Sequence, residues 1–266
     1  MNKKFAICYN PYVENSKEVK DILLETLNSK SVNAEIISID SLSDGFDFVF
    51  VIGGDGTILK ASRYYSKSQT PILGINLGHL GFLSQVSRNE INIGIEKILQ
   101  NQYRIEKRMM LEFENYVALN DFVIKGNDSS RAAKFALEIN DKFVCEYLAD
   151  GIIISTPTGS TAYNMASGGP ILSPNVEAIA IVPICPHTFS ARPIVVSSDD
   201  KIKILQAKSD KKYIVSADGQ EVFNISHNIE VKKSRYFANL VMLDDSDFYS
   251  ILRNKLHWGT TPAYSK

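Results

Sequence analysis

The residues in this sequence best suited to chemistry form a glycine-rich turn with a carboxylate inside it, Gly53-Gly54-Asp55-Gly56-Thr57. The turn follows an apolar run at 48–52 and precedes residues with helical periodicity. Glycine lets a backbone approach a ligand closely, and the amides at a helix start favour phosphate. A carboxylate there would repel phosphate unless it accepts a proton from an attacking hydroxyl or holds Mg²⁺. The structural alternative is that Asp55 caps the helix.

Two common nucleotide-binding signatures are missing. The sequence has no GxxxxGK[ST] loop, and its glycines do not have the GxGxxG spacing. The turn at 53–57 therefore predicts phosphate binding by a different route.

A second dense segment runs from Asp150-Gly151 through an apolar strand to Thr158-Gly159-Ser160-Thr161-Ala162-Tyr163. Its hydroxyls could hold a polar ligand, and the Tyr163 ring offers a flat face on which a base can stack. The alternative is a strand–turn–helix capped by Thr158 or Ser160. Asn120-Asp121 is a weaker feature, typical of sugar or amide binding but also of an ordinary turn.

The elements that must position these residues change in type along the chain. Up to about residue 101, apolar runs alternate with helical patterns, which predicts an α/β N-terminal domain with a parallel, Rossmann-like sheet covered on both faces. We expect strands at 5–9, 34–39, 48–52 and 72–75, and helices at 14–28, 58–65 and 91–99.

Residues 102–245 read as a β-rich C-terminal domain with turn signals between short strands. A helix is expected at 247–256, and the tail 246–266 is predicted to pack back on the first domain. The strands expected in the β-rich domain are 116–119, 135–139, 202–205, 213–215 and 229–231.

Composition excludes several classes of function. The 29 basic and 30 acidic residues nearly cancel, which argues against nucleic acid as a partner. No apolar stretch approaches the length of about 20 residues that spans a bilayer, so no membrane is expected. Cys8, Cys145 and Cys185 are predicted to be free, buried thiols in a cytoplasmic protein. The four histidines lack metal-ligand spacing, so no protein-held metal is expected.

Taken together, these segments resemble the NAD kinase family. The resemblance rests on 53–57, on the loop at 74–83, on Asn120-Asp121 where the family usually has Asn-Glu, on 150–163 with Gly168-Gly169-Pro170-Ile171-Leu172, and on 186–193. It covers most of the chain in order. Because GGDGT also occurs in diacylglycerol-type lipid kinases, the later segments decide between the two families.

The resemblance implies an activity: transfer of the γ-phosphate of ATP to the 2′-hydroxyl of the adenosine ribose of NAD, with Mg²⁺ or another divalent cation on ATP. Asp55 would be the general base. The phosphates would be approached by the backbone of Gly54 and Gly56 and neutralised in part by Lys60. A ribose would be bound by Asn120 and Asp121. The nicotinamide amide would be contacted by Asp150. Further ligand contacts are implied for Phe82, Arg131, Thr158, Thr161, Ala162, Tyr163, Ala166 and Gln220.

The sequence departs from the family pattern at Asp121, which is one methylene shorter than Glu, and at Leu148, where many relatives have Arg. The resemblance also implies a homo-oligomer, either a dimer or a tetramer. Two alternatives stay open: a lipid or sphingoid-base kinase of the same superfamily, and a non-catalytic NAD(P) sensor.

Overall fold

The structure of the chain is a computed structural model that describes residues 3–78, 81–128, 131–205, 212–243 and 248–257. It divides into two compact units. The first comprises Met1–Ala61, Thr70–Glu106 and Asn239–Lys266; the second comprises Ser62–Gln69 and Lys107–Ala238.

The first unit is built on a parallel sheet with strand order β2-β1-β3-β4. Strand β5 pairs with β4 in parallel, and Leu240 of β17 pairs with Ile72 of β4. The strands are β1 (Phe5–Tyr9), β2 (Ala34–Ser38), β3 (Phe48–Ile52), β4 (Ile72–Ile75) and β5 (Ser84–Val86). Every residue of β3 is buried, as expected for a strand covered on both faces.

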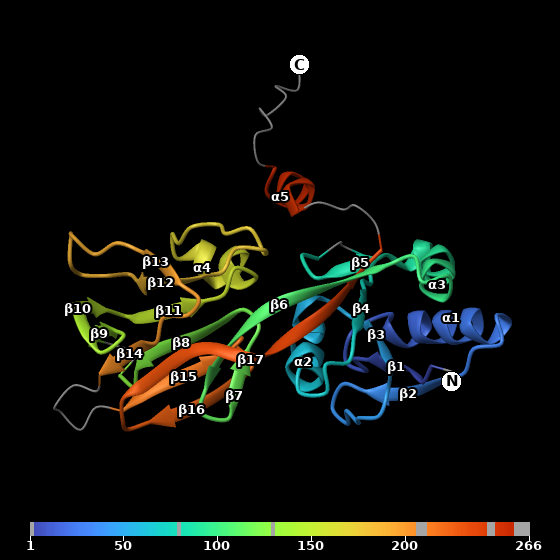
Figure 1. Cartoon of the computed structure of the whole chain (residues 1–266), viewed down its shortest axis with the longest axis horizontal. Helices are drawn as coiled ribbons and strands as arrows, with labels where there is room; N and C mark the ends of the chain where they lie inside the picture. The colour runs from blue at the N-terminus through green and yellow to red at the C-terminus, as the bar shows by residue number, and fades with distance from the viewer. Residues whose placement is uncertain (1–2, 79–80, 129–130, 206–211, 244–247, 258–266) are drawn as a thin grey trace, which may run out of the picture. The chain divides into compact units, whose positions relative to one another are not determined.

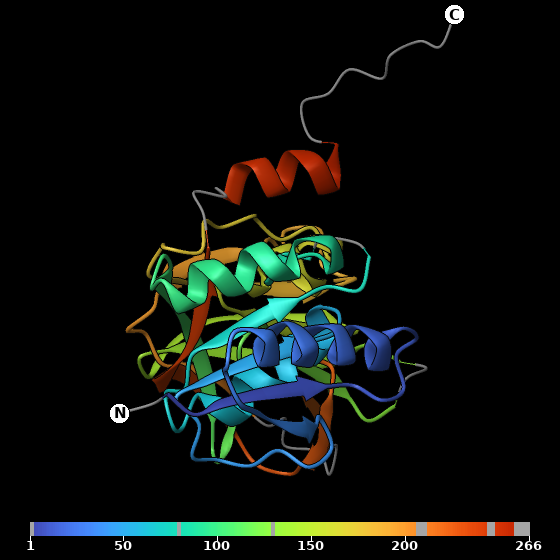
Figure 2. The same cartoon turned by 90° about the vertical axis from the view of Figure 1, so that its right-hand side faces the viewer.

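Helices α1 (Ser16–Ser29) and α3 (Ile91–Leu99) lie side by side over one face of this sheet (Figures 1 and 2). The buried residues of α3 recur at spacings of three and four, which puts an apolar stripe on one side of the helix. That stripe joins a core made with α1 and with alternate residues of the strands, among them Leu23, Ile7, Phe50 and Leu73.

The remaining helices of the first unit are α2 (Asp55–Tyr65), whose last residues are grouped with the second unit, and α5 (Phe248–Leu256). No described helix has both the length and the apolar character needed to cross a bilayer.

One sheet of the second unit is antiparallel, with strand order β13-β12-β11-β8-β15-β16. Its strands are β8 (Asp121–Gly126), β11 (Gly151–Ser155), β12 (Ala178–Ile184), β13 (Ile194–Ser197), β15 (Tyr213–Ala217) and β16 (Glu221–Ile225). A 3₁₀ turn (Gly159–Thr161) and the short helix α4 (Tyr163–Ala166) follow β11.

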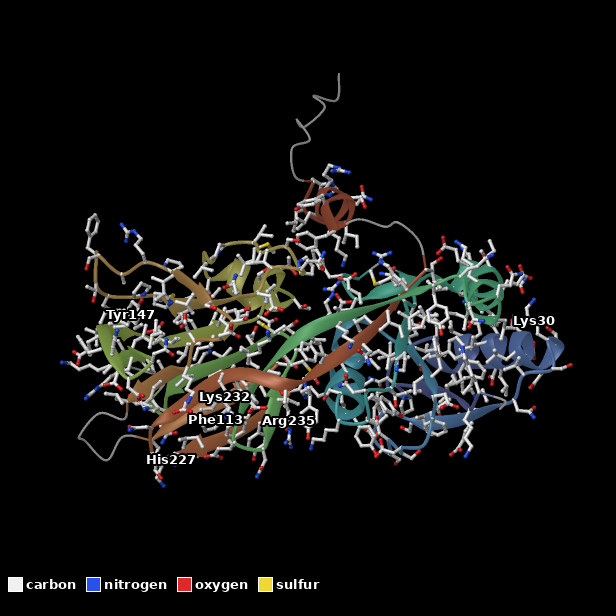
Figure 3. The ribbon with its side chains drawn as sticks, in the orientation of Figure 1. Lys30, Phe113, Tyr147, His227, Lys232 and Arg235 are labelled. Carbon is white, nitrogen blue, oxygen red and sulfur yellow. The ribbon has the colours of Figure 1, made fainter. Side chains whose placement is uncertain are left out.

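The other sheet of the second unit runs β10-β9-β14-β17, also antiparallel (Figure 1). Its strands are β9 (Ala133–Ile139), β10 (Lys142–Ala149), β14 (Ile202–Leu205) and β17 (Ile229–Met242). Side chains from both sheets form one core, in which the rings of Phe135 and Tyr213 stack with centroids 5.3 Å apart. The hairpin of β6 (Arg104–Phe113) and β7 (Tyr116–Ala118) adds an aromatic stack, with Phe113 lying near His227 (Figure 3).

The predicted fold class is confirmed: an α/β N-terminal part with a parallel sheet and a β-rich C-terminal part. Strands 5–9, 48–52, 72–75 and 202–205 and helix 91–99 have the predicted bounds. The strand predicted at 229–231 is only the start of β17, and the apolar strand predicted after Asp150-Gly151 is β11. No bounds were predicted for β8, and β5, β6, β10, β12, β13 and β16 were not predicted as strands.

The cysteine prediction was partly wrong. All three thiols are free, but only Cys8 is buried; Cys145 is half-buried and Cys185 is exposed. Cys145 lies on β10, the end strand of its sheet among the described residues, and packs only partly against the core. Residues 79–80 of the predicted loop, and residues 246, 247 and 258–266 of the predicted tail, lie outside the described residues.

Replacing Ile95 by alanine should lower the free energy of unfolding by about 2–5 kcal/mol, because the side chain is buried in the core of the first unit and its loss leaves a cavity. Urea denaturation measures this change. Ile93 is the matched control, since it lies on the same helix but is 58% exposed; Ile93→Ala should change stability by less than about 1 kcal/mol. Equal losses for the two variants would contradict the assigned face of α3.

Candidate functional site

The glycine-rich turn joins β3 to α2 in the first unit. The Gly53 amide donates to the carbonyl of Ile75 at 3.0 Å, which ties the turn to the end of β4. Helix α2 starts at Asp55, and the amides of Thr57 and Ile58 donate to the Gly54 carbonyl at 2.9 and 3.2 Å. The turn thus lies where the strands end, the edge at which open α/β sheets bind ligands.

The carboxylate of Asp55 is held by the loop that follows β4. The amides of Phe82 and Leu83 donate to its two oxygens at 3.0 and 3.2 Å. At Gly81 a methyl group would lie 1.9 Å from Asp55 Oδ1, so this loop can approach the carboxylate only with glycine there. Both of these hydrogen bonds to the carboxylate come from another loop, which favours a fixed functional group over a helix cap.

Two predicted ligand residues lie in the same unit. Lys60 pairs with Asp40 at 2.9 Å, and both side chains are partly exposed. Phe82 lies beneath the Lys255 ammonium of α5, whose nitrogen is 5.3 Å from the ring centre.

The second unit contains a pocket of about 450 Å³ on the outer face of its β8 sheet. Side chains alternate along a strand, and on β8 Phe122 and Ile124 point into the core while Asp121, Val123 and Lys125 line the pocket. The neighbouring strand β15 follows the same rule, contributing alternate residues to core and pocket. The lining consists of Asn120, Asp121, Val123, Lys125, Ala162, Tyr163, Ile214, Ser216, Asp218, Gly219 and Val222.

The pocket combines a flat aromatic surface with polar groups. Tyr163 is 38% exposed, and the Lys125 ammonium lies 5.7 Å from its ring centre. Asn120, Asp121 and Ser216 supply an amide, a carboxyl and a hydroxyl on the same lining. Such a lining could hold a base against the ring and hydrogen-bond a sugar.

Asp218, in the turn between β15 and β16, organises the strand start that carries Asn120 and Asp121. Its carboxylate accepts the backbone amides of Leu119, Asn120 and Asp121 at 3.1, 2.7 and 3.2 Å. Its own amide donates to the Asp121 carbonyl at 2.9 Å. Arg63 Nη1 donates to the same carboxylate at 3.1 Å, and the Asp218 side chain is fully buried.

The two carboxyl groups influence each other. Burial raises the pKa of Asp121 from its ordinary 3.8 to about 7, and the charge of Asp218 adds to the increase. Burial also raises the pKa of Asp218, opposed by the Arg63 cation and by the amides of Leu119 and Asn120. Since Asp218 is surrounded by N–H donors, it is the member of the pair that keeps its negative charge.

The loop after β11 is bonded to the same strand start. The Thr156 amide donates to the Asn120 carbonyl at 2.8 Å, and its hydroxyl donates to the Leu119 carbonyl at 2.6 Å. At Gly159 a methyl group would lie 2.1 Å from the Asn120 carbonyl oxygen, so the close approach requires glycine. Arg108 is buried and donates to the Thr158 hydroxyl at 3.3 Å.

The structure brings four of the predicted residues to this pocket: Asn120, Asp121, Ala162 and Tyr163. The described lining does not include six others. Thr158 is buried, the Thr161 hydroxyl donates to the Thr158 carbonyl, and Arg131 (beside Asp128), Asp150, Ala166 and Gln220 are exposed.

Sequence reasoning missed Asp218, Arg63, Lys125 and Ser216. Asp218 was interpreted only as part of a turn signal, since Asp-Gly is common in hairpins. Residues 121–125 read Asp-Phe-Val-Ile-Lys. The two polar residues at positions 121 and 125 share one face of a strand, and this was the signal that could have indicated a lining face.

Asp121→Asn should stabilise the protein at about pH 8 and have little effect at about pH 4. Between pH 3.8 and about 7 the folded chain keeps a proton on Asp121 that the unfolded chain has lost, so stability falls as pH rises through this window. The gain should be on the order of a few kcal/mol, since one pKa unit corresponds to about 1.4 kcal/mol. Urea denaturation at several pH values measures it.

The control for this prediction is Asp199→Asn, which removes one charge from an exposed residue of the same unit. If Asp121→Asn gave the same change in stability at both pH values, the assignment of the buried proton to Asp121 would be wrong.

Comparison with known proteins identifies the family. Models of the ATP-NAD kinase N-terminal and C-terminal domains match residues 5–103 and 119–243. An NAD kinase of Caldanaerobacter subterraneus is 46% identical over 221 residues, covering 79% of this chain and 78% of the relative. An NAD kinase of Clostridium botulinum (strain Kyoto / Type A2) is 35% identical, with 96% of this chain and 97% of the relative covered.

Two solved structures have a similar fold. An NAD kinase from Archaeoglobus fulgidus in complex with ATP has a TM-score of 0.80 at 27% identity, covering 96% of this chain and 98% of its own. The yeast NADH kinase complexed with NADH has a TM-score of 0.88 at 23% identity, covering 100% of this chain and 91% of its own, and shows the shared fold. The chain therefore belongs to the NAD kinase family, whose members are kinases that act on NAD.

Proposed function

We propose that this chain transfers the γ-phosphate of ATP to the 2′-hydroxyl of the adenosine ribose of NAD, giving NADP and ADP. Asp55 is the general base that accepts the proton of this hydroxyl as its oxygen attacks the phosphorus. Family membership supports the reaction. The observation that carries the assignment of Asp55 is that two loop amides hold its carboxylate in one orientation.

The pocket of the second unit is the proposed site for the adenosine part of NAD. Tyr163 stacks on the base, with Ala162 beside it, and Asn120 and Asp121 bind ribose hydroxyls. Asp121 is one methylene shorter than the usual Glu, but it lies in the pocket lining, so its carboxyl can still face a ribose.

The triphosphate is proposed to bind at the glycine-rich turn. Gly54 and Gly56 are exposed, so a ligand can reach their backbone. Lys60 is a partly exposed cation about one turn further along α2. A divalent cation bound to ATP would neutralise phosphate charge. Within the described ranges His, Cys, Asp and Glu nowhere gather in threes that could hold a metal, and Mg²⁺ commonly takes its ligands from phosphates, water and one or two carboxylates.

Other ligand contacts stay predictions from family membership: Asp150 with the nicotinamide amide, and contacts from Phe82, Arg131, Thr158, Thr161, Ala166 and Gln220. Three further predictions also stay untested: the domain limits 1–101 and 102–245, a homodimer or homotetramer, and a cytoplasmic location. The described cysteines form no disulfide, which supports a reducing compartment.

The two family models speak against a lipid or sphingoid-base kinase, since they cover both parts of the chain. A non-catalytic NAD(P) sensor would share these features, and only turnover separates it from an enzyme.

Incubation with NAD and ATP–Mg²⁺ should yield NADP, and Asp55→Asn should lower kcat by about 10²–10⁴-fold because the proton acceptor is lost. A coupled assay specific for NADP measures this, with NADH tested in parallel as the acceptor. NAD binding without NADP formation by the unaltered chain would favour the sensor.

The matched control is Asp47→Asn, because Asp47 also accepts a backbone amide, that of Lys4, at 2.8 Å in the same unit. It should keep turnover. If Asp55→Asn still turns over at nearly the original rate, Asp55 is not the base.

Tyr163→Ala should raise KM for NAD by about 5–100-fold, since stacking a base on an aromatic ring is worth roughly 1–3 kcal/mol. Tyr163→Phe keeps the ring and should change KM for NAD by about twofold at most. KM for ATP should stay the same in both variants. Equal changes in KM for NAD and for ATP would show that the adenine ring of NAD does not stack on Tyr163.

A further inference from the structure

We propose that Asp218, held by Arg63, is a positioning residue for NAD: it fixes the strand start that presents Asn120 and Asp121, and it places a permanent negative charge beside the Asp121 carboxyl. The inference rests on the proposed function, because it takes the pocket as the NAD site. The residues involved, including Arg63, all belong to the second unit.

The first support is geometric. One carboxylate accepts the amides of three consecutive residues, 119–121, and the Asp218 amide returns a bond to the Asp121 carbonyl. These contacts fix the backbone from which the side chains of Asn120 and Asp121 project into the pocket. An amide in place of the carboxylate keeps only one oxygen acceptor, so Asn at 218 cannot satisfy the same set of donors.

The second support is the buried ion pair. Arg63 is 7% exposed, donates to Asp218 at 3.1 Å, and bonds through Nη2 to Glu221 at 3.3 Å. A buried arginine costs solvation, and pairing with Asp218 offsets that cost. The pair therefore keeps a negative charge on Asp218, at a place where a neutral turn residue would suffice for the hairpin alone.

The negative charge of Asp218 acts on the Asp121 carboxyl group. The ionisable groups on the pocket side are Asp218 from the β15–β16 turn, Lys125 from the same strand and Tyr163 from α4. Burial and the Asp218 charge give the Asp121 carboxyl a pKa of about 7, so it changes its charge near neutral pH. A ribose hydroxyl donates best to an ionised carboxylate, so NAD should bind more weakly as pH falls through about 7.

The experiment measures NAD binding to the full-length chain by isothermal titration calorimetry from about pH 5 to about pH 9, with NADP formation assayed separately. In the unaltered chain, the affinity for NAD should fall as pH is lowered, with a midpoint near pH 7. Asp218→Asn should weaken NAD binding by about tenfold at pH 8, because the strand start is no longer fixed. It should also move the midpoint to lower pH, because the neighbouring charge is gone.

Glu221→Gln is the matched control. Glu221 bonds to the same arginine but is half exposed and lies outside the pocket lining, so affinity and midpoint should stay unchanged. Asp121→Asn is the second variant, since it keeps the contacts of Asp218; it should abolish the pH step.

A merely structural role for Asp218 would lower stability and leave the midpoint where it is, and that result would overturn the proposal. A pH step that persists in Asp121→Asn would overturn it too. A chain that binds NAD with the expected step but forms no NADP would contradict the kinase function and leave the positioning role supported.

Discussion

The buried carboxylate of Asp218 is the interaction on which the proposed NAD pocket depends. Four N–H donors converge on it: three backbone amides of consecutive residues and the guanidinium of Arg63. Backbone amides that are buried must be satisfied, and here no β-ladder does so for all three. The carboxylate serves instead, and in doing so it fixes the point at which β8 begins.

That arrangement shows how a buried charge can specify a conformation. Buried ion pairs add little net stability, because the cost of desolvating both charges offsets most of their Coulomb attraction. What the Arg63–Asp218 pair provides is one defined backbone at Asn120 and Asp121, together with a local field that raises the pKa of the Asp121 carboxyl. The chemistry proposed for the pocket depends on both.

The loop after β4 and the loop after β11 follow one plan. Each comes at the end of a buried strand, and each brings its backbone close to a partner where only glycine fits: Gly81 against the Asp55 carboxylate, and Gly159 against the Asn120 carbonyl. In both places the glycine lets a polar group be held by neighbouring backbone instead of by water. Preorganised groups of this kind are what phosphoryl transfer requires, since most of its catalysis is positioning.

The sequence by itself determined the parallel sheet of the first unit, because its strands are apolar on both faces and its helices have clear 3.6-residue periodicity. It also determined the glycine-rich turn with Asp55 and the family, because motif residues are local in the chain. It did not give the bounds of β8 or its lining face, because Phe122-Val123-Ile124 is a short apolar run and does not show which of its side chains face a pocket. Only the tertiary structure decided the roles of Asp218 and Arg63: they lie 97 and 58 residues from Asp121 along the chain (218 − 121 and 121 − 63), and their importance comes from burial and from contacts between segments that no local pattern records.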